Sequence, residues 1–318
     1  RRCYATSMTD VLSDVLDTVA LKAAIYFRTD FYPAFSIAVP SYRRAARFHL
    51  VVQGTCYVTL ADGTRTKLRA GDLALVPGGA GHLLSSSETV EGQPLGDVIQ
   101  QAGFTGSGPF IVGSGEAGES CQMVCGHFSF ADGADHPLLR SIPDLLHVTA
   151  ADRASRPMLD DVLRLLVRRM FEGEPGATAS VSRLSEVLFI EAIHAGIAQA
   201  PEISRLISAV YDPQIGKALS LIHGDVAHGW TVESLAAAVG MSRSRFAERF
   251  RELVGSGPMA YIVDWRLQRA LNLLAESNVP IKTVANRVGY RSAAAFTRAF
   301  SERFGCSPKE RRMSSNAA

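Results

Sequence analysis

The last third of the chain contains one pattern of residues twice, and this repeat restricts the fold more than any other feature. The segment Val232–Gly240 reads VESLAAAVG, and Ile281–Gly289 reads IKTVANRVG. After the final glycine of each segment, the offset between the copies grows by one residue. The matching pairs are Leu235 and Val284, Ala236 and Ala285, Val239 and Val288, Gly240 and Gly289, Phe246 and Phe296, Phe250 and Phe300, Gly255 and Gly305, and Pro258 and Pro308. Such a repeat predicts one supersecondary unit that is built twice.

Each copy has the pattern of a short helix, a turn and a second helix. Thr231 and Ser242 stand where the N-caps of the first pair of helices belong, and Ser292 stands where the last helix would be capped. Gly240 and Gly289 fall in the turns, where we expect a positive φ. This is the pattern of a helix-turn-helix, whose second helix lies in the major groove of DNA.

The charge distribution also favours a polyanionic partner. From Asp212 onward the sequence has 15 Lys and Arg and 9 Asp and Glu, a net charge of +6, whereas the preceding residues carry −4. The near-neutral total of +2 hides this division. A generic helical bundle is the alternative. Two helix-turn-helix patterns in register, joined by one long helix predicted over 259–276 and rich in arginine, instead favour a reader of double-stranded DNA.

Residues from about 213 to 312 resemble the DNA-binding domain of the AraC/XylS family of transcription regulators. The carrying stretches are WTVESLAAAVGMSRSRFAERFRELVG from Trp230 and PIKTVANRVGYRSAAAFTRAFSERFGCSP from Pro280. The resemblance implies that two recognition helices enter successive major grooves of promoter DNA. It also implies an activator that works with RNA polymerase, without enzymatic activity.

Outward positions on the two recognition helices supply the candidate DNA contacts. We expect Arg245 and Arg298 to read bases, since arginine suits bidentate contact with guanine, and we expect most other arginines to hold phosphates. Ala293 and Ala294 leave the second helix poor in polar readers, so the first unit should carry more of the specificity. The candidates are Arg243, Ser244, Arg245, Arg249, Arg291, Thr297 and Arg298.

The N-terminal part reads as short strands separated by turns. The segments 48–52 and 56–60 are strand-like, Asp62-Gly63 is a hairpin turn, and 85–120 reads mostly as loop with a short apolar piece at 110–112. Many short strands predict a sandwich or a barrel. The segment from Gly71 to His82 fits the cupin motif G-x5-P-x-G-x2-H, so the domain resembles a cupin.

The other cupin motif, H-x-H-x3-E, is altered here. Only His49 of that motif remains, since Arg47 replaces the first histidine and Gln53 replaces the glutamate. Arginine cannot ligate a metal and glutamine is a poor ligand, so we expect no metal or other cofactor. A metal held weakly by His49 and His82, in a metal-dependent sensor or a cupin enzyme with an accessory DNA-binding domain, is the alternative.

The same residues predict where a signal is sensed. We expect His49, Gln53 and His82 to point into a pocket for a small effector. The other interpretation is that the two histidines only hydrogen-bond to strand backbone.

Cysteines offer a second kind of sensor. Cys56, Cys121 and Cys125 lie on strand-like segments, and the domain is similar to that of the reactive-chlorine-sensing activator of this family, so these thiols are candidate redox groups. In one extended strand Cys121 and Cys125 are about 13 Å apart, too far for a disulfide. Burial as small apolar side chains is the alternative.

The sequence predicts an α+β protein of consecutive parts. They are a leader at 1–9 expected to be disordered, a cupin-like β-sandwich at 10–132, a helical connector at 133–211, and an all-α double helix-turn-helix domain at 212–318. In the connector, the helix over 181–197 is apolar on more than one face, which favours either a homodimer interface or an internal core. No apolar run is long enough to span a membrane and no signal peptide is visible, so we expect a cytoplasmic protein.

Overall fold

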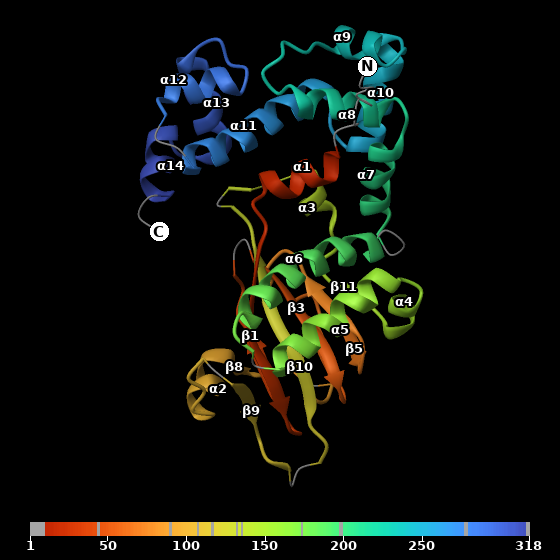
Figure 1. The fold of residues 1–318 in the computed structure, drawn as a ribbon, viewed down its shortest axis with the longest axis vertical. Helices are drawn as coiled ribbons and strands as arrows, with labels where there is room; N and C mark the ends of the chain where they lie inside the picture. The colour runs from red at the N-terminus through yellow and green to blue at the C-terminus, as the bar shows by residue number, and fades with distance from the viewer. Residues whose placement is uncertain are drawn as a thin grey trace. The chain divides into compact units, whose positions relative to one another are not determined.

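The computed structural model describes residues 10–42, 45–88, 91–106, 108–115, 118–131, 133–134, 136–172, 174–196, 200–276 and 279–315. These residues form two compact units, drawn in Figure 1. The β unit contains 21–130 and 142–201, and the helical unit contains 10–20, 131–141 and 202–315. The units are thus interleaved along the chain. The division into consecutive domains at 10–132, 133–211 and 212–318 stays a prediction. The leader at 1–9 lies outside the described residues.

The β unit is built on two sheets, as the sequence predicts. The first sheet contains, in spatial order, β11 (Leu146–Val148), β6 (Leu73–Val76), β3 (Ala45–Gln53), β10 (Cys121–Ser129), β1 (Lys22–Phe31) and β9 (Pro109–Val112). The second contains β5 (Arg65–Arg69), β4 (Thr55–Leu60), β7 (His82–Ser85), β2 (Ser36–Val39) and β8 (Gln93–Pro94). An apolar core of side chains from both sheets, among them Val51, Val58 and Met123, lies between them.

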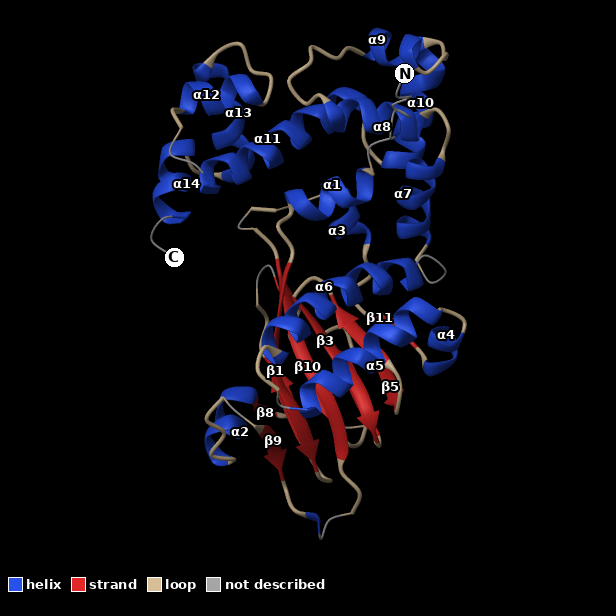
Figure 2. Ribbon diagram, in the orientation of Figure 1, coloured by secondary structure: helices blue, strands red, loops and turns tan. Residues whose placement is uncertain are grey.

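Helices cover the outer face of the first sheet, which Figure 2 shows. These are α5 (Pro157–Glu172) and α6 (Ala177–Gly196), with the short α4 (Ala150–Ala154) before them. The Phe189 ring of α6 lies 4.9 Å from that of Phe128 on β10, and Ser182 Oγ donates to Ala23 O at 2.6 Å. The apolar character of α6 is therefore explained by an internal core, which is one of the two alternatives that its sequence left open.

The segment 85–120 is more ordered than its glycine-rich sequence predicts. It contains β8, the helix α2 (Leu95–Gln101) and β9, which holds the short apolar piece at 110–112, and α2 is the element that the sequence did not predict. Leu95, Val98 and Ile99 have the i, i+3, i+4 spacing of a helix face and pack on the β-unit core. Short elements between many glycines gave too few repeats of this pattern for the helix to be recognised.

The helical unit confirms the double helix-turn-helix. Its helices are α1 (Val11–Thr18), α3 (Pro137–Ser141), α7 (Pro201–Tyr211), α8 (Ile215–Gly224), α9 (Val232–Ala238), α10 (Arg243–Val254), α11 (Pro258–Glu276), α12 (Ile281–Arg287), α13 (Ala293–Phe304) and α14 (Pro308–Ser315). The hydroxyls of Thr231, Ser242 and Ser292 accept the expected cap hydrogen bonds. Gly240 and Gly289 have φ of +70° and +83°, as both turns require.

Two segments far from the repeat in sequence belong to the helical unit. The helix α1 precedes β1, and 131–141 follow β10. Asn272 Nδ2 on α11 donates to Thr18 O of α1 at 2.8 Å, and the His136 ring lies edge-on to that of Trp265 on α11, at 5.9 Å. Because β1 and β10 are neighbours, with Lys22 opposite Ser129, the chain leaves the β unit twice at the same end of one strand pair.

None of the described helices combines the length and the apolar composition that a membrane crossing requires.

Candidate nucleic-acid interface and sensor sites

The two recognition helices, α10 and α13, bury corresponding faces and expose corresponding faces. Phe246 and Phe250 of α10, and Phe296 and Phe300 of α13, are 0% exposed. Each helix ends at a glycine in the left-handed conformation, with φ of +84° at Gly255 and +71° at Gly305. Inward aromatic pairs therefore fix the rotation of each helix, and the polar side of each is left for a partner.

The two residues predicted to read bases have exposed side chains that form no ion pair with the described residues. Arg245 on α10 and Arg298 on α13 are exposed, and neither forms an ion pair within the described part of the chain. Arg291, just before α13, is exposed in the same way, whereas Thr297 is half-buried. A guanidinium with no acidic partner keeps all five N–H donors for bases or phosphates.

The other arginines of the first unit are already paired. Arg243 Nε lies 2.6 Å from Glu233 Oε1, and Arg249 lies 3.1 Å from both Asp212 and Glu252. The hydrogen bond to Asp212, followed by that to Glu252, raises the pKa of Arg249 above its ordinary value. Arg243 and Arg249 would have to exchange these partners to hold phosphates.

The polar neighbour of these arginines, Ser244, is exposed, with its hydroxyl 3.5 Å from that of Ser242.

Arg266 of α11 connects the two helix-turn-helix units, and the sequence analysis did not single it out. Its guanidinium donates to Val226 O at 2.9 Å and to His228 O at 2.7 Å, in the loop before α9. The same group lies against Gly289 in the turn of the second unit, where a Cβ would come within 2.8 Å of Arg266 Cζ. An ion pair at 2.8 Å also joins Asp264 of α11 to Arg303 of α13. These contacts fix the spacing of α10 and α13.

His49 and His82, predicted to lie together, do meet inside the β unit. They face each other from β3 and β7, with 2.8 Å between their Nε2 atoms. His49 Nδ1 lies 3.2 Å from Cys125 Sγ, and His82 Nδ1 lies 3.0 Å from Ala80 O. Burial lowers the pKa of His82 to about 4 and holds that of His49 well below its usual value, so both rings are neutral near pH 7.

Neutral rings give this chain of hydrogen bonds one direction. Because Ala80 O only accepts, His82 donates to it from Nδ1, and its Nε2 accepts from the Nε2–H of His49. His49 Nδ1 then accepts from the Cys125 thiol. Burial raises the pKa of that thiol, which agrees with its role as donor. The histidines thus bond to each other and to a thiol, beyond the backbone contact expected in the second interpretation.

This arrangement does not fit a metal ion. Two nitrogens on one tetrahedral zinc are about 3.3 Å apart, since each bond is about 2.0–2.1 Å. The two Nε2 atoms are closer than that and share a proton. Among the described residues, no group of three or more His, Cys, Asp or Glu side chains is placed to bind one.

The histidine pair also has little space around it. The cavity beside His49 and Cys125 has a volume of about 20 Å³ and is otherwise lined largely by apolar side chains. Gln53, the third predicted pocket residue, is exposed at the end of β3, four residues beyond His49, and does not join the pair.

The three candidate redox cysteines lie in one apolar core. Cys56 of β4 and Cys121 and Cys125 of β10 are 0%, 3% and 4% exposed. A hydrogen bond with Cys121, together with burial, raises the pKa of the Cys56 thiol well above its usual value. The geometric sulfur contact of Cys56 is with Met123, 3.7 Å between Sγ and Sδ, and the raised pKa values of Cys56 and Cys125 keep these two thiols protonated.

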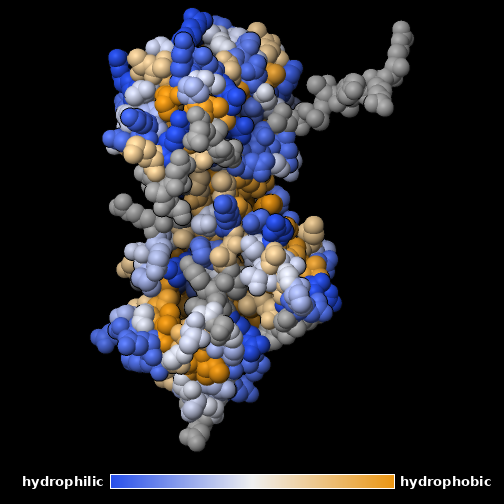
Figure 3. All heavy atoms as spheres, turned by 60° about the vertical axis from the view of Figure 1, so that its left-hand side comes forward, coloured by the Kyte–Doolittle hydropathy of each residue, from blue (hydrophilic) through white to orange (hydrophobic). Residues whose placement is uncertain are grey.

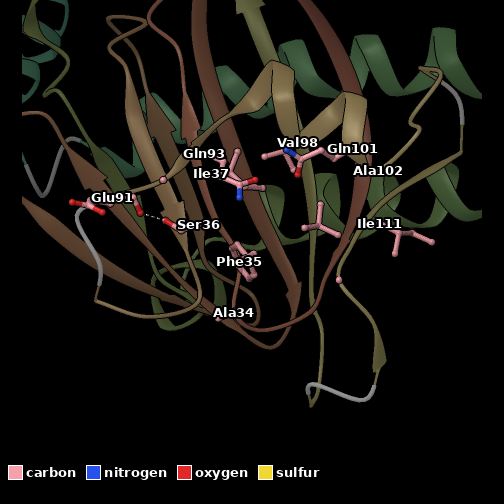
Figure 4. A pocket seen from close by; sticks show the side chains of 13 residues that line it. Ala34, Phe35, Ser36, Ile37, Glu91, Gln93, Val98, Gln101, Ala102 and Ile111 are labelled. Carbon is pink, nitrogen blue, oxygen red and sulfur yellow. Dashed lines mark hydrogen bonds between the residues drawn. The ribbon is translucent and has the colours of Figure 1, made fainter.

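A larger pocket lies where β2 and β8, at one edge of the second sheet, approach β9, at the edge of the first sheet, and the sequence analysis missed it. It has a volume of about 810 Å³ and is lined by 34–37, 91–93, Val98, 101–102 and 111–113 (Figure 4). The helix α2 and the strand β9 of the 85–120 segment form much of its wall. The apolar spacing of Leu95, Val98 and Ile99 was the signal that could have revealed it.

Comparisons with known proteins match both units. A family model described as Cupin matches residues 10–198, and one described as Helix-turn-helix domain matches residues 235–314. The chain is 31% identical to the HTH-type transcriptional regulator AlkR of Acinetobacter baylyi, over 96% of this chain and 100% of that protein. A putative AraC-like transcription regulator of Streptomyces antibioticus is 30% identical, over 82% and 79% of the two chains. The RCS-specific HTH-type transcriptional activator RclR of Escherichia coli is 28% identical, over 84% of each chain.

Proposed function

Since the chain belongs to the cupin-containing AraC family of helix-turn-helix transcription regulators, we propose that α10 and α13 read promoter DNA under the control of a signal sensed in the β unit. The observation that carries this proposal is that Arg245 on α10 and Arg298 on α13 are both exposed and form no ion pair within the described residues. The 19 residues of α11 span about 28 Å. That length is close to the 34 Å or so between successive major grooves on one face of B-DNA.

The test is genome-wide mapping of bound DNA with the wild-type chain and with the double variant Arg245→Ala, Arg298→Ala. We expect the variant to lose the promoter peaks of the wild type. Arg69→Ala, at an exposed arginine of β5, is the control and should keep them. Retention of the same peaks by the double variant would contradict the proposed interface.

The coupling between the units would be a shift in population between conformations. A signal molecule changes the presentation of α10 and α13 only if it binds one conformation of the β unit more tightly than the other conformation. Both chain segments that leave β1 and β10 continue into parts packed on α11, which gives the signal a direct covalent route. We propose activation, with RNA polymerase as the partner, in the cytoplasm.

We propose a homodimer whose interface includes the exposed side of α5. Met158 and Leu165 are 59% and 40% exposed and stand seven residues apart, hence on the same side of the helix. The variant Met158→Glu, Leu165→Glu should be monomeric by light scattering, and a wild-type chain that is itself monomeric would contradict this part.

An oxidant is the second candidate signal, favoured by the presence of Cys56 and Cys121 in one cluster of the core. Hypochlorous acid would convert one thiol to a sulfenyl chloride with release of water, and the other thiol would then displace chloride to form a disulfide. Because a protonated thiol reacts slowly, a response would require the core to open. An unchanged promoter response to hypochlorite in a Cys56, Cys121, Cys125 triple serine variant would exclude these thiols.

We propose that the cupin fold senses and does not catalyse. The two motif histidines are occupied by each other, by Cys125 and by Ala80 O, which supports a structural role for them. Stoichiometric metal in protein purified without chelator, lost on His49→Ala or His82→Ala, would instead support the alternative of a metal-dependent sensor or enzyme.

A further inference from the structure

We propose that the pocket between β2, α2 and β9 is a binding site for an uncharged amphipathic small molecule. The inference rests on the proposed function, because it assigns the kind of signal that the β unit senses. It also moves the effector site away from His49 and His82, where the cavity of about 20 Å³ holds no more than one water-sized group.

The pocket has the dimensions and the layered lining of a ligand site. Its volume of about 810 Å³ falls in the range that small-molecule sites occupy. Phe35, Ile37 and Val98 line it and also belong to the buried core, at 4%, 1% and 5% exposure. In Figure 3, where the side that carries α2 is turned forward, hydrophobic patches lie among hydrophilic ones in the lower part of the molecule. An apolar body can therefore lie against the core while one side faces water.

Glycine brings one wall of the pocket close to the sheet. A Cβ at Gly92 would collide with Leu83 Cδ1 and come within 3.1 Å of Ala38 N. A side chain at this position would require Leu83 to move and the backbone before β8 to shift slightly away from β2. Ser36 Oγ of β2 then donates to Glu91 O at 2.5 Å, which ties the two walls together.

The charges around the pocket select against anions. Among the described residues that line it there is no Lys, Arg or His, and Glu91 is the one ionisable residue. Figure 4 shows the Glu91 carboxylate at the margin of the set, turned outward, and the Gln93 and Gln101 side chains nearer its middle. An anion would lose water here without gaining a counter-charge, whereas two amides supply donors and acceptors to a hydroxyl or an amide.

Occupancy of the pocket has a direct connection to the DNA-reading part of the chain. Ile111 and Val112 of its wall lie on β9, which pairs with β1 from Arg28 to Phe31. The strand β1 follows α1, and α1 packs on α11 through the Thr18–Asn272 hydrogen bond. A ligand that moves β9 therefore acts on a strand that is continuous with the helical unit.

Three small molecules that share a phenylbutyl group and differ in charge test the inference. These are 4-phenyl-1-butanol, 4-phenylbutylamine and 4-phenylbutyrate, and binding to the full-length protein is measured by saturation-transfer NMR. We expect the alcohol to bind with a dissociation constant of roughly millimolar or below, and the carboxylate to bind at least ~10-fold more weakly. Equal or tighter binding of the carboxylate would overturn the proposed ligand class.

Ala102→Trp locates the binding. Ala102 lines the pocket, is exposed at the end of α2 and has ordinary helical dihedral angles, so a larger side chain fills the pocket without disturbing the core. The matched control is Ala151→Trp on α4, an exposed alanine of the same unit that does not line the pocket. We expect binding of the alcohol to be lost in the first variant and kept in the second. Unchanged binding in Ala102→Trp would overturn the site.

The same proteins separate this inference from the proposed function. DNA retention is measured on genomic fragments in parallel with probe binding. If the wild type retains no specific fragment, the proposed function fails while binding of the alcohol that depends on Ala102 supports the pocket. If it retains specific fragments but binds the alcohol equally with and without Ala102→Trp, the pocket inference alone fails.

Discussion

On the first recognition helix, the arginines differ in whether the protein already satisfies them. Arg245 has no acidic partner in the described residues, whereas Arg243 is held by Glu233 and Arg249 by Asp212 and Glu252. Exposed ion pairs of this kind contribute little to stability, but they position the guanidinium groups. Spacing along a helix assigns such residues to one surface, and it does not reveal which of them are engaged from neighbouring helices.

Arg245→Ala should weaken binding to the preferred promoter sequence by about 1–3 kcal/mol and relax specificity at one base pair. The measurement is competition binding against duplexes with single base-pair changes, at several salt concentrations. Arg243→Ala is the matched control and should cause a smaller loss that is uniform across sequences. If Arg245→Ala itself gives a uniform loss and a shallower salt dependence, the residue holds a phosphate.

At the scale of helices and strands, the local features were the ones that the sequence could predict. The caps at Thr231 and Ser242 and the turn at Gly240 depend on neighbouring residues, and the repeat contains the second cap and the turn again, at Ser292 and Gly289. The role of Arg266 was not predictable from the sequence. Its partners, Val226, His228 and Gly289, come together only after α11 has packed between the two helix-turn-helix units.

In the β unit, too, the sequence did not predict features that depend on residues far apart in the chain. The cupin motif located His49 and His82, whose strands face each other in this fold. The motif did not predict the position of Gln53 correctly. Gln53 replaces the motif glutamate and has no ligand to hold, and its side chain is exposed. The large pocket was missed because its walls come from short elements in a glycine-rich segment, where hydrophobic periodicity is weak.

Arg266→Lys should impair binding to a complete promoter site more than binding to half of it. A lysine ammonium lacks the planar fork whose two nitrogens donate to Val226 O and His228 O, so the spacing of α10 and α13 becomes less fixed. We expect an affinity loss of roughly 10-fold on the full site, about 1.4 kcal/mol, and little change on a duplex that presents one groove. Similar losses on both duplexes would contradict a spacing role. Thermal unfolding of the variant is the control for loss of fold.

For the whole molecule, buried neutral histidines make stability depend on pH. Burial lowers the pKa of His82 to about 4 and that of His136, in the helical unit, to about 3. In the unfolded chain both titrate near their ordinary value of about 6.5. Below that pH the unfolded state binds protons that the folded state does not, so stability is complete above about pH 6.5 and falls toward pH 4.

Each of these histidines should cost up to roughly 1.4 kcal/mol per pH unit in this window. Urea unfolding at pH 7.0, 6.0 and 5.0 gives the slope. His82→Gln is expected to lower stability at pH 7 and to flatten the slope by one proton. A slope in the variant equal to that of the wild type would show that His82 is not buried in the neutral form.

The interleaving of the two units has a consequence for how this chain can be divided. A fragment that begins at Asp212 would carry both recognition helices but would lack α1 and 131–141, which cover α8 and α11 in the intact protein. The surface left bare would include the side of α11 that bears Trp265 and Tyr261. The β unit and the helical unit therefore cannot be exchanged between proteins as single continuous segments. A chimera that keeps its regulation must carry the N-terminal helix and the segment after β10 along with the repeat.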